Sequence, residues 1–164
     1  MRRTKFVQYK RKKEGRTDYK KRLTLLKSGR LRLVIRKSLK NVSVQIVKYE
    51  DNGDKIMTSA SSKELKKAGW KGSGRNLPAA YLVGLMCGVK AKKQKLNGLI
   101  LDAGLQKLFK GNLIYCAMKG VVDAGVEVAC SEEVFPSEER IQGKHISDSV
   151  AKEFEAMKSK ILKV

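Results

Sequence analysis

The sequence predicts an α/β fold in which helices pack on a mixed sheet, built from a three-stranded antiparallel meander and two parallel crossover strands. Residues 31–60 contain three consecutive segments with the alternation and β-branched content of half-buried strands, separated by turn residues. Residues 76–128 then alternate helix-length and strand-length apolar segments, an order that favours right-handed parallel crossovers. A basic N-terminal extension and a C-terminal helix flank these segments.

The expected organisation is one core with two appendages. A basic extension with a short helix occupies residues 1–29, an α/β core occupies 30–130, and a loop followed by an amphipathic helix occupies 131–164. At 18.4 kDa the chain is long enough to bury a core without disulfides or metals.

The first expected elements are a helix and the meander. Thr17 or Asp18 can cap a short helix over residues 19–27, which ends at Ser28 and Gly29. The three strands follow at residues 31–37, 42–47 and 55–60. The turn over residues 51–54 contains Asn-Gly, which supplies the positive backbone angles that a hairpin needs.

The second half alternates helices and strands. A short polar helix (62–68) and an exposed loop (69–75) lead to a helix that Asn76 caps and that runs to about Lys93. Small residues form a stripe on that helix and would let it lie close to the sheet: Ala80, Gly84, Gly88 and Ala91. A strand (98–102), a helix (112–124) and a last strand (126–128) complete the core.

The C-terminal helix (147–162) carries the apolar stripe Val150, Phe154, Met157 and Ile161, which needs a surface to cover it. Its own domain, another protein and RNA are the three candidates, and the sequence leaves all three open.

Positive charge is concentrated at the N-terminus. The first forty residues contain 17 of the 37 lysines and arginines and only two acids, so about +15 of the net +21 lies there. Such a segment cannot bury enough apolar surface to offset the entropy of ordering it, whereas a phosphate backbone releases counterions when the segment binds. Phe6, Tyr9 and Tyr19 interleave with the cations, which suits stacking on unpaired bases. A solvated tail or a localisation signal is the alternative interpretation.

The composition gives little support to a metal-binding, nucleotide-binding or membrane-spanning protein. The cysteines Cys87, Cys116 and Cys130 form no Cys-x-x-Cys pair, and His145 is the only histidine, so neither a zinc site nor a cofactor is expected. The pattern indicates a reducing, intracellular compartment. The glycines of residues 69–75 do not have the spacing of a nucleotide-binding loop. No segment has the length or flanks of a membrane span or secretory signal, so a soluble protein is expected.

Six segments resemble the archaeal and eukaryotic branch of the L18 family of large-subunit ribosomal proteins. They are residues 9–19 (YKRKKEGRTDY), 32–38 (RLVIRKS), 69–84 (with GWKG and NLPAAYLVG), 101–105 (LDAGL), 119–125 (KGVVDAG) and 140–146 (RIQGKHI). The eukaryotic relatives carry a much longer C-terminal extension, so the chain is expected to be the archaeal form.

The resemblance implies a structural ribosomal protein of the cytoplasm that binds 5S rRNA and mediates its attachment to 23S-type rRNA in the central protuberance. A protein of the fifth large-subunit family would be a neighbour on the same RNA. The implied fold is related to the ribonuclease H topology.

The expected RNA-binding residues fall into three groups. Phosphate contacts are expected from Arg2, Arg3, Lys5, Lys10, Arg11, Lys12, Lys13, Arg16, Lys20, Lys21 and Arg22. A fixed edge would be formed by Arg32, Arg36, Lys37, Asn41, Lys71, Ser73 and Arg75, with stacking from Tyr9 and Trp70. Trp70 is alternatively a core or loop-anchoring residue. Lys144 and His145 match the family's terminal motif, although His145 is equally consistent with a structural hydrogen bond.

Two rival functions are weaker. An RNA-cleaving enzyme would need clustered carboxylates for divalent metals, but the first strand carries none, and Asp102, Asp123 and Glu127 have no evident fourth partner. Asp102 is better interpreted as a strand-end residue whose carboxylate caps the following turn. A general polyanion or membrane-surface binder would use only the tail, which has no apolar helical face.

Overall fold

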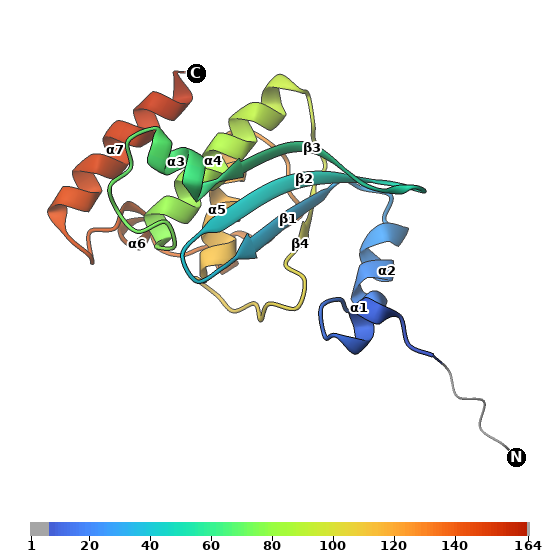
Figure 1. Ribbon diagram of the computed structural model, residues 1–164. Coiled ribbons are helices and arrows are strands. Elements are labelled where there is room, and N and C mark those ends of the chain that lie inside the picture. The colour runs from blue at the N-terminus through green and yellow to red at the C-terminus, as the bar shows by residue number, and fades with distance from the viewer. Residues whose placement is uncertain (1–6, 164) are drawn as a thin grey trace, which may run out of the picture.

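The computed structural model describes residues 7–163, which form a layered α/β fold with a basic segment at one end (Figure 1). The elements in chain order are α1 (Lys10–Lys13), α2 (Tyr19–Lys27), β1 (Arg32–Lys37), β2 (Val42–Glu50), β3 (Gly53–Ser61), α3 (Ser62–Lys67), α4 (Leu77–Lys93), β4 (Ile100–Asp102), α5 (Leu113–Asp123), the 3₁₀ helix η1 (Glu132–Val134), α6 (Glu138–Gln142) and α7 (Asp148–Leu162). Arg2, Arg3, Lys5 and Phe6, for which RNA contacts are predicted, lie outside the described residues.

The sheet is mixed, as predicted. Its strand order is β3-β2-β1-β4, with antiparallel pairing of β1 to β2 and of β2 to β3, and parallel pairing of β1 to β4. A bulge between Ile46 and Val47 shifts the β2–β3 register. The β2–β3 hairpin is longer than expected and projects past the ends of β1 and β4 (Figure 1).

The prediction of a second parallel strand over residues 126–128 is wrong. In the described residues this segment makes one isolated parallel bridge, Leu99 with Val128. Leu99 N donates to Glu127 O at 2.9 Å and Ala129 N donates to Leu99 O at 3.0 Å, and the pairing stops there. The apolar alternation had indicated a strand, but a strand also needs a partner along its whole length.

Helices α4 and α5 cover one face of the sheet and pack closely on each other (Figure 1). A Cβ added at Gly84 would lie 1.9 Å from Ala117 O, and one added at Gly120 would lie 2.2 Å from Tyr81 O. The small-residue stripe of α4 was expected to face the sheet, but Gly84 and Gly88 approach α5 instead. Glycine is therefore required where the two helix backbones meet.

Helix α7 packs back on its own protein, which decides among the three surfaces that the sequence left open. Phe154, Met157 and Ile161 are buried, and the ring of Phe154 lies 5.4 Å from that of Tyr81 on α4. Lys160 Nζ also donates to Ala68 O at 2.8 Å.

Within residues 7–163, no helix is both long enough and apolar enough to cross a membrane.

Side-chain caps begin four of the helices, and those of α2 and α4 are the predicted Asp18 and Asn76. The side chains of Asp18, Asn76, Asn112 and Ser147 accept hydrogen bonds from backbone amides in the first turns of α2, α4, α5 and α7. Helix α1 was not predicted. Its four residues are all positively charged and repel one another, and none of them is buried, so the sequence carries no helical signal there.

Candidate nucleic-acid interface

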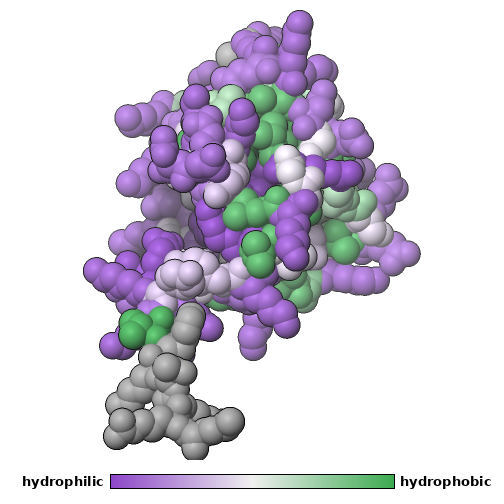
Figure 2. All heavy atoms as spheres, turned by 90° about the vertical axis from the view of Figure 1, so that its right-hand side faces the viewer, coloured by the Kyte–Doolittle hydropathy of each residue, from purple (hydrophilic) through white to green (hydrophobic). Residues whose placement is uncertain are grey.

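The N-terminal segment forms a basic unit around two tyrosines. All four residues of α1 are exposed lysines or an arginine. The rings of Tyr9 and Tyr19 lie 5.0 Å apart at 36°, and Arg11 Nε donates to Thr17 Oγ1 at 2.9 Å. Tyr9 remains 64% exposed, so much of its ring is accessible to a base. Figure 2 shows hydrophilic side chains over most of this end of the molecule, around smaller hydrophobic patches.

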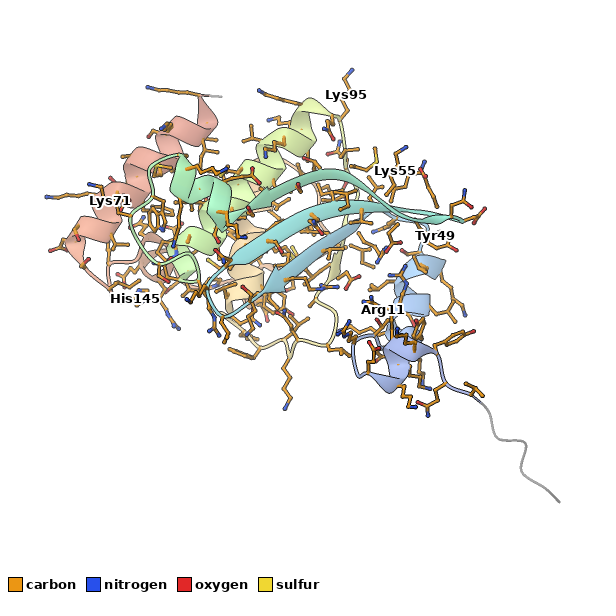
Figure 3. All side chains as sticks on the ribbon, in the orientation of Figure 1. Arg11, Tyr49, Lys55, Lys71, Lys95 and His145 are labelled. Carbon is orange, nitrogen blue, oxygen red and sulfur yellow. The ribbon has the colours of Figure 1, made fainter. Side chains whose placement is uncertain are left out.

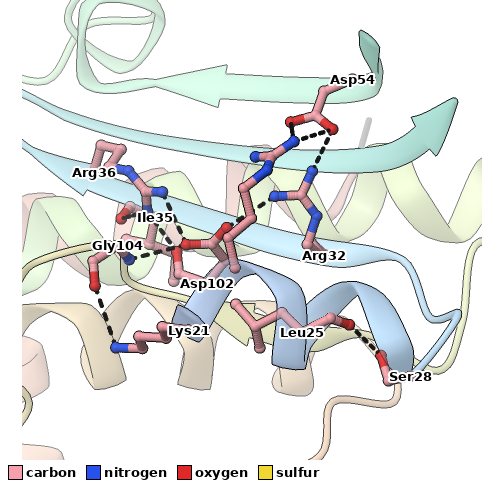
Figure 4. A network of polar contacts seen from close by, with 10 residues as sticks. Lys21, Leu25, Ser28, Arg32, Ile35, Arg36, Asp54, Asp102 and Gly104 are labelled. Carbon is pink, nitrogen blue, oxygen red and sulfur yellow. Dashed lines mark hydrogen bonds and ion pairs between the residues drawn. The ribbon is translucent and has the colours of Figure 1, made fainter. Parts of the chain in front are cut away.

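Helix α2 is attached to the sheet by two polar contacts (Figure 4). Arg22 Nη2 donates to both carboxylate oxygens of Asp54 at 2.9 Å, linking α2 to the β2–β3 hairpin. Lys21 Nζ donates to the carbonyl of Gly104 at 3.2 Å, linking α2 to the loop after β4. These contacts give the basic segment a defined position beside the sheet.

A network of ion pairs continues from Asp54 into the sheet. The buried Arg32 lies 2.6 Å from Asp54 through Nη2 and 3.0 Å from Asp102 through Nη1. Arg36 Nη2 donates to Asp102 at 2.9 Å from the other side. Burial acts to raise the pKa of Asp54 and of Asp102, but their arginine partners outweigh it and hold both pKa values below the ordinary value.

These contacts revise the role expected for Arg32. With 2% exposure and both neighbouring carboxylates engaged, its side chain is unavailable to a phosphate, and we assign it to holding the sheet edge together. Asp102 has the predicted turn-capping role, since its Oδ1 accepts from Gly104 N at 2.9 Å. Among residues 7–163, no three acidic, histidine or cysteine residues group as metal ligands.

A basic hollow lies at the turn between β1 and β2 and brings together several predicted residues. It has a volume of about 290 Å³ and is lined by Arg36, Lys37, Ser38, Asn41, Val42, Ser43, Ser61 and Lys63. No carboxylate is in this lining. Arg75 reaches the same turn, where its Nη1 lies 3.5 Å from Leu39 O. The fold thus brings Arg75 to the turn that carries Arg36, Lys37 and Asn41, although it lies 36 residues beyond Leu39 in the sequence.

Trp70 does not project from its loop as a stacking residue would. It is 3% exposed, its Nε1 donates to Ser73 O at 3.2 Å, and a Cβ at Gly72 would lie 2.9 Å from its ring. The stacking expectation is therefore replaced by the alternative, a loop anchor. Lys71 and Ser73 keep exposed side chains, although the Lys71 amide donates to Glu153 on α7.

Lys144 and His145 are exposed between α6 and α7. Figure 3 shows His145 and Lys71 toward one end of the molecule and Arg11 at the other. Basic and polar side chains are therefore exposed at both ends of the fold. The remaining predicted cations of the N-terminal segment, Lys10, Lys12, Lys13, Arg16 and Lys20, are all exposed.

Sequence reasoning missed the loop between β4 and α5. Leu105 is 55% exposed and Phe109 63% exposed, and Lys107 and Lys110 lie among them. The same interleaving of aromatic residue and cations that marked the N-terminal tail is present here and could have identified the loop. Lys63, which lines the hollow at the β1–β2 turn, gave no local signal in the sequence.

Comparison with known proteins decides the family. The family model described as "Ribosomal large subunit proteins 60S L5, and 50S L18" matches residues 3–100. The chain belongs to this family. Large ribosomal subunit protein uL18 of Methanococcus maripaludis is 43% identical over 160 residues, covering 96% of this chain and 83% of the relative. The protein of the same name from Korarchaeum cryptofilum is 45% identical over 146 residues, covering 89% and 75%.

These matches identify an archaeal L18-type ribosomal protein and confirm the resemblance seen in the sequence. L18-type proteins are structural components of the cytoplasmic ribosome, not enzymes. The family model ends at residue 100. Three parts of the chain lie beyond the match: the loop that joins β4 to α5, helix α5 itself and helix α7.

Proposed function

We propose that this L18-type protein binds 5S rRNA and mediates its attachment to 23S-type rRNA in the central protuberance, beside a protein of the fifth large-subunit family. The observation that carries the proposal is the anchoring of the basic α1–α2 segment to the sheet through Arg22 and Lys21. In this proposal residues 1–29 are the RNA-binding extension, 30–130 the core, and 131–164 the C-terminal appendage. A ribonuclease H-like topology remains part of the prediction.

Arg36 supports a continuous RNA-binding face. It lines the hollow at the β1–β2 turn and also a cavity beside α2. Exposed cations on α1, on α2 and at the β1–β2 turn therefore flank β1, the strand that carries Arg36. A fixed array of this kind selects among RNAs by the spacing of their phosphates, whereas a tail without structure neutralises any polyanion.

The first experiment measures binding of the full chain to 5S rRNA and to a size-matched control RNA across a salt series. A variant lacking residues 1–16 keeps Asp18, the cap of α2, and Arg22, so the contact with Asp54 survives. We expect it to bind 5S rRNA more weakly, to retain its preference over the control RNA, and to show a shallower salt dependence. Equal binding to both RNAs by the full chain would refute the 5S assignment.

A second comparison tests the folded surface. Lys37→Gln and Arg75→Gln each remove one exposed cation at or beside the β1–β2 turn, and Lys95→Gln removes an exposed cation just after the C-cap of α4. The first two should weaken 5S binding and reduce the salt slope by about one each. If Lys95→Gln has the same effect as the other two, affinity follows net charge and the proposed face is wrong.

A further inference from the structure

An apolar groove lies between α4 and α7, on the side of the molecule away from α1 and α2 (Figure 1). Its apolar lining comes from Met86 and Val89 on α4, from Met157 and Ile161 on α7, and from Ala68, the C-cap of α3. Three lysines complete the lining, and no carboxylate of the described residues takes part in it. Neither the family match nor the relatives' names assign a partner to this groove.

The groove runs along its two helices. The residues that α4 contributes lie at positions 86, 89, 90 and 93, the spacing of one helix face over two turns. Those of α7 lie at positions 157, 160 and 161, which follow the same spacing. A trough between two helix faces receives a third helix that presents its own apolar face. The volume is about 150 Å³, the size of a cavity that holds a benzene ring, so one leucine or phenylalanine side chain fills it.

The packing of α7 leaves part of this apolar surface accessible. Met157 and Ile161 are 6% and 7% exposed, whereas Met86 and Val89 on the facing helix are only half-buried. Methionine is unbranched and polarizable, so two methionines in one lining adapt to apolar side chains of different shape. An apolar side chain that docks here removes the remaining surface from water, which is the main favourable contribution to association.

Positive charge borders the groove. The last turns of α3, α4 and α7 carry six lysines: Lys66, Lys67, Lys90, Lys92, Lys93 and Lys160. Glu64 neutralises one of them, since its carboxylate lies 2.8 Å from Lys90 Nζ. Lys160 donates to the carbonyl of Ala68 and forms no ion pair with any residue of 7–163. The partial negative charge at three helix C-termini is smaller than the positive charge that remains, so the groove favours an acidic partner.

The combination of an apolar floor and a basic border selects among possible occupants. A second copy of the chain carries a net charge of +21 and would be repelled. RNA matches the charge, but the polar edges of a base would find no partner on the apolar floor. We propose that the groove docks an acidic amphipathic helix of a protein partner, with a large apolar side chain in the groove and carboxylates beside the lysines. This inference goes beyond the proposed RNA binding and does not depend on it.

The test uses the full chain with carbon-13-labelled methionine methyl groups and two synthetic helical peptides. The first peptide carries leucine at every third or fourth position on one face and glutamate on the other faces. The second has alanine in place of each leucine, so both have the same charge and remain helical. We expect the leucine peptide to shift the methyl signals of Met86 and Met157 and to leave that of Met118, which is 1% exposed in the core, unchanged. Met86→Leu and Met157→Leu assign the two signals.

Fluorescence anisotropy measures the affinity of each peptide. The leucine peptide should bind at least about tenfold more tightly than the alanine peptide, the effect of burying one large apolar side chain. Val89→Glu should abolish this difference, and Ile56→Glu, which adds the same charge at an exposed position of β3, should keep it. Lys160→Gln should weaken the leucine peptide about two- to fivefold more than Lys152→Gln, a change at an exposed position of α7 outside the groove.

Equal affinity for the two peptides would overturn the proposal, as would a folded Val89→Glu protein that still prefers the leucine peptide. Hexauridylate tests for an RNA occupant: if it shifts the Met86 and Met157 signals and the leucine peptide does not, the proposal is wrong. Shifts that follow the protein concentration alone would assign the groove to a second copy and would also overturn it. None of these measurements uses 5S rRNA, so a failure here is distinguishable from a failure to bind that RNA.

Discussion

Asp102→Asn removes one charge from the centre of the ion-pair network while preserving the shape of the side chain. The Asp102 carboxylate accepts from three donors: Arg32 Nη1 at 3.0 Å on one oxygen, and Arg36 Nη2 and Gly104 N, each at 2.9 Å, on the other. An asparagine has one acceptor oxygen, and its NH₂ group would face an arginine that can only donate. At least one donor therefore loses its partner.

The magnitude follows from the burial of Arg32, whose side chain is 2% exposed and 3.0 Å from Asp102. Removing one member of a buried ion pair costs about 3–5 kcal/mol, because the remaining charge stays out of water. For a protein of this length that loss lowers Tm by about 10 °C. Asp54 still contacts Arg32 in the variant, which places the expected loss toward the lower end of the range.

The effect should depend on pH with a defined sign. The folded-state pKa of Asp102 is held below its ordinary value, so its contribution to stability is fully present above the unfolded pKa of about 4. It is lost as the pH falls through the folded-state value. The difference in unfolding free energy between wild type and Asp102→Asn should therefore be constant near neutral pH and shrink below about pH 4.

The assay is urea unfolding followed by far-UV circular dichroism, repeated at several pH values. Asp51→Asn is the matched control, because Asp51 is exposed at the tip of the β2–β3 hairpin. The control should change the free energy of unfolding by less than about 0.5 kcal/mol. An Asp102→Asn protein within about 1 kcal/mol of wild type at neutral pH would refute the argument.

Three further outcomes follow from the structure. Trp70→Phe should lower Tm because it loses the bond to Ser73, yet leave 5S rRNA affinity within about twofold; a large affinity loss at unchanged Tm would restore a stacking role. Iodoacetamide at pH 8 should label only the exposed Cys130 in the native protein, since Cys87 and Cys116 are buried and burial raises the pKa of each to about 12; mass spectrometry reads the sites, and rapid labelling of the buried pair would contradict the packing. Phe154→Ala should cost about 3–5 kcal/mol in chemical unfolding, and a loss under 1 kcal/mol would mean that α7 does not contribute to the core.

Local signals were sufficient for most helices and for the meander. Asp18 and Asn76 cap α2 and α4 as predicted, because a cap acts on amides two or three residues away. The strands at residues 32–37 and 42–50 follow their alternation, since one face is buried against α4 and α5.

Predictions that depended on distant partners were less accurate. The segment at residues 126–128 has the composition of a strand but pairs at a single bridge. Trp70 stands among glycines and cations, which indicated an exposed loop, yet its ring is buried. In both cases the deciding contact comes from a residue or surface that the local pattern does not specify.

The sequence by itself determined that positive charge is concentrated in the N-terminal quarter and that the chain resembles the L18 family, because charge and motif are properties of residue order. Only the tertiary structure decided which of these cations remain exposed. Arg32 and Arg36 are four residues apart on one strand and both pair with Asp102. Asp54 also pairs with Arg32, whose side chain is 2% exposed, whereas that of Arg36 is 41% exposed and lines two hollows. The physical reason is that an arginine's availability depends on the carboxylates that the fold brings to it, and these come from β3 and β4.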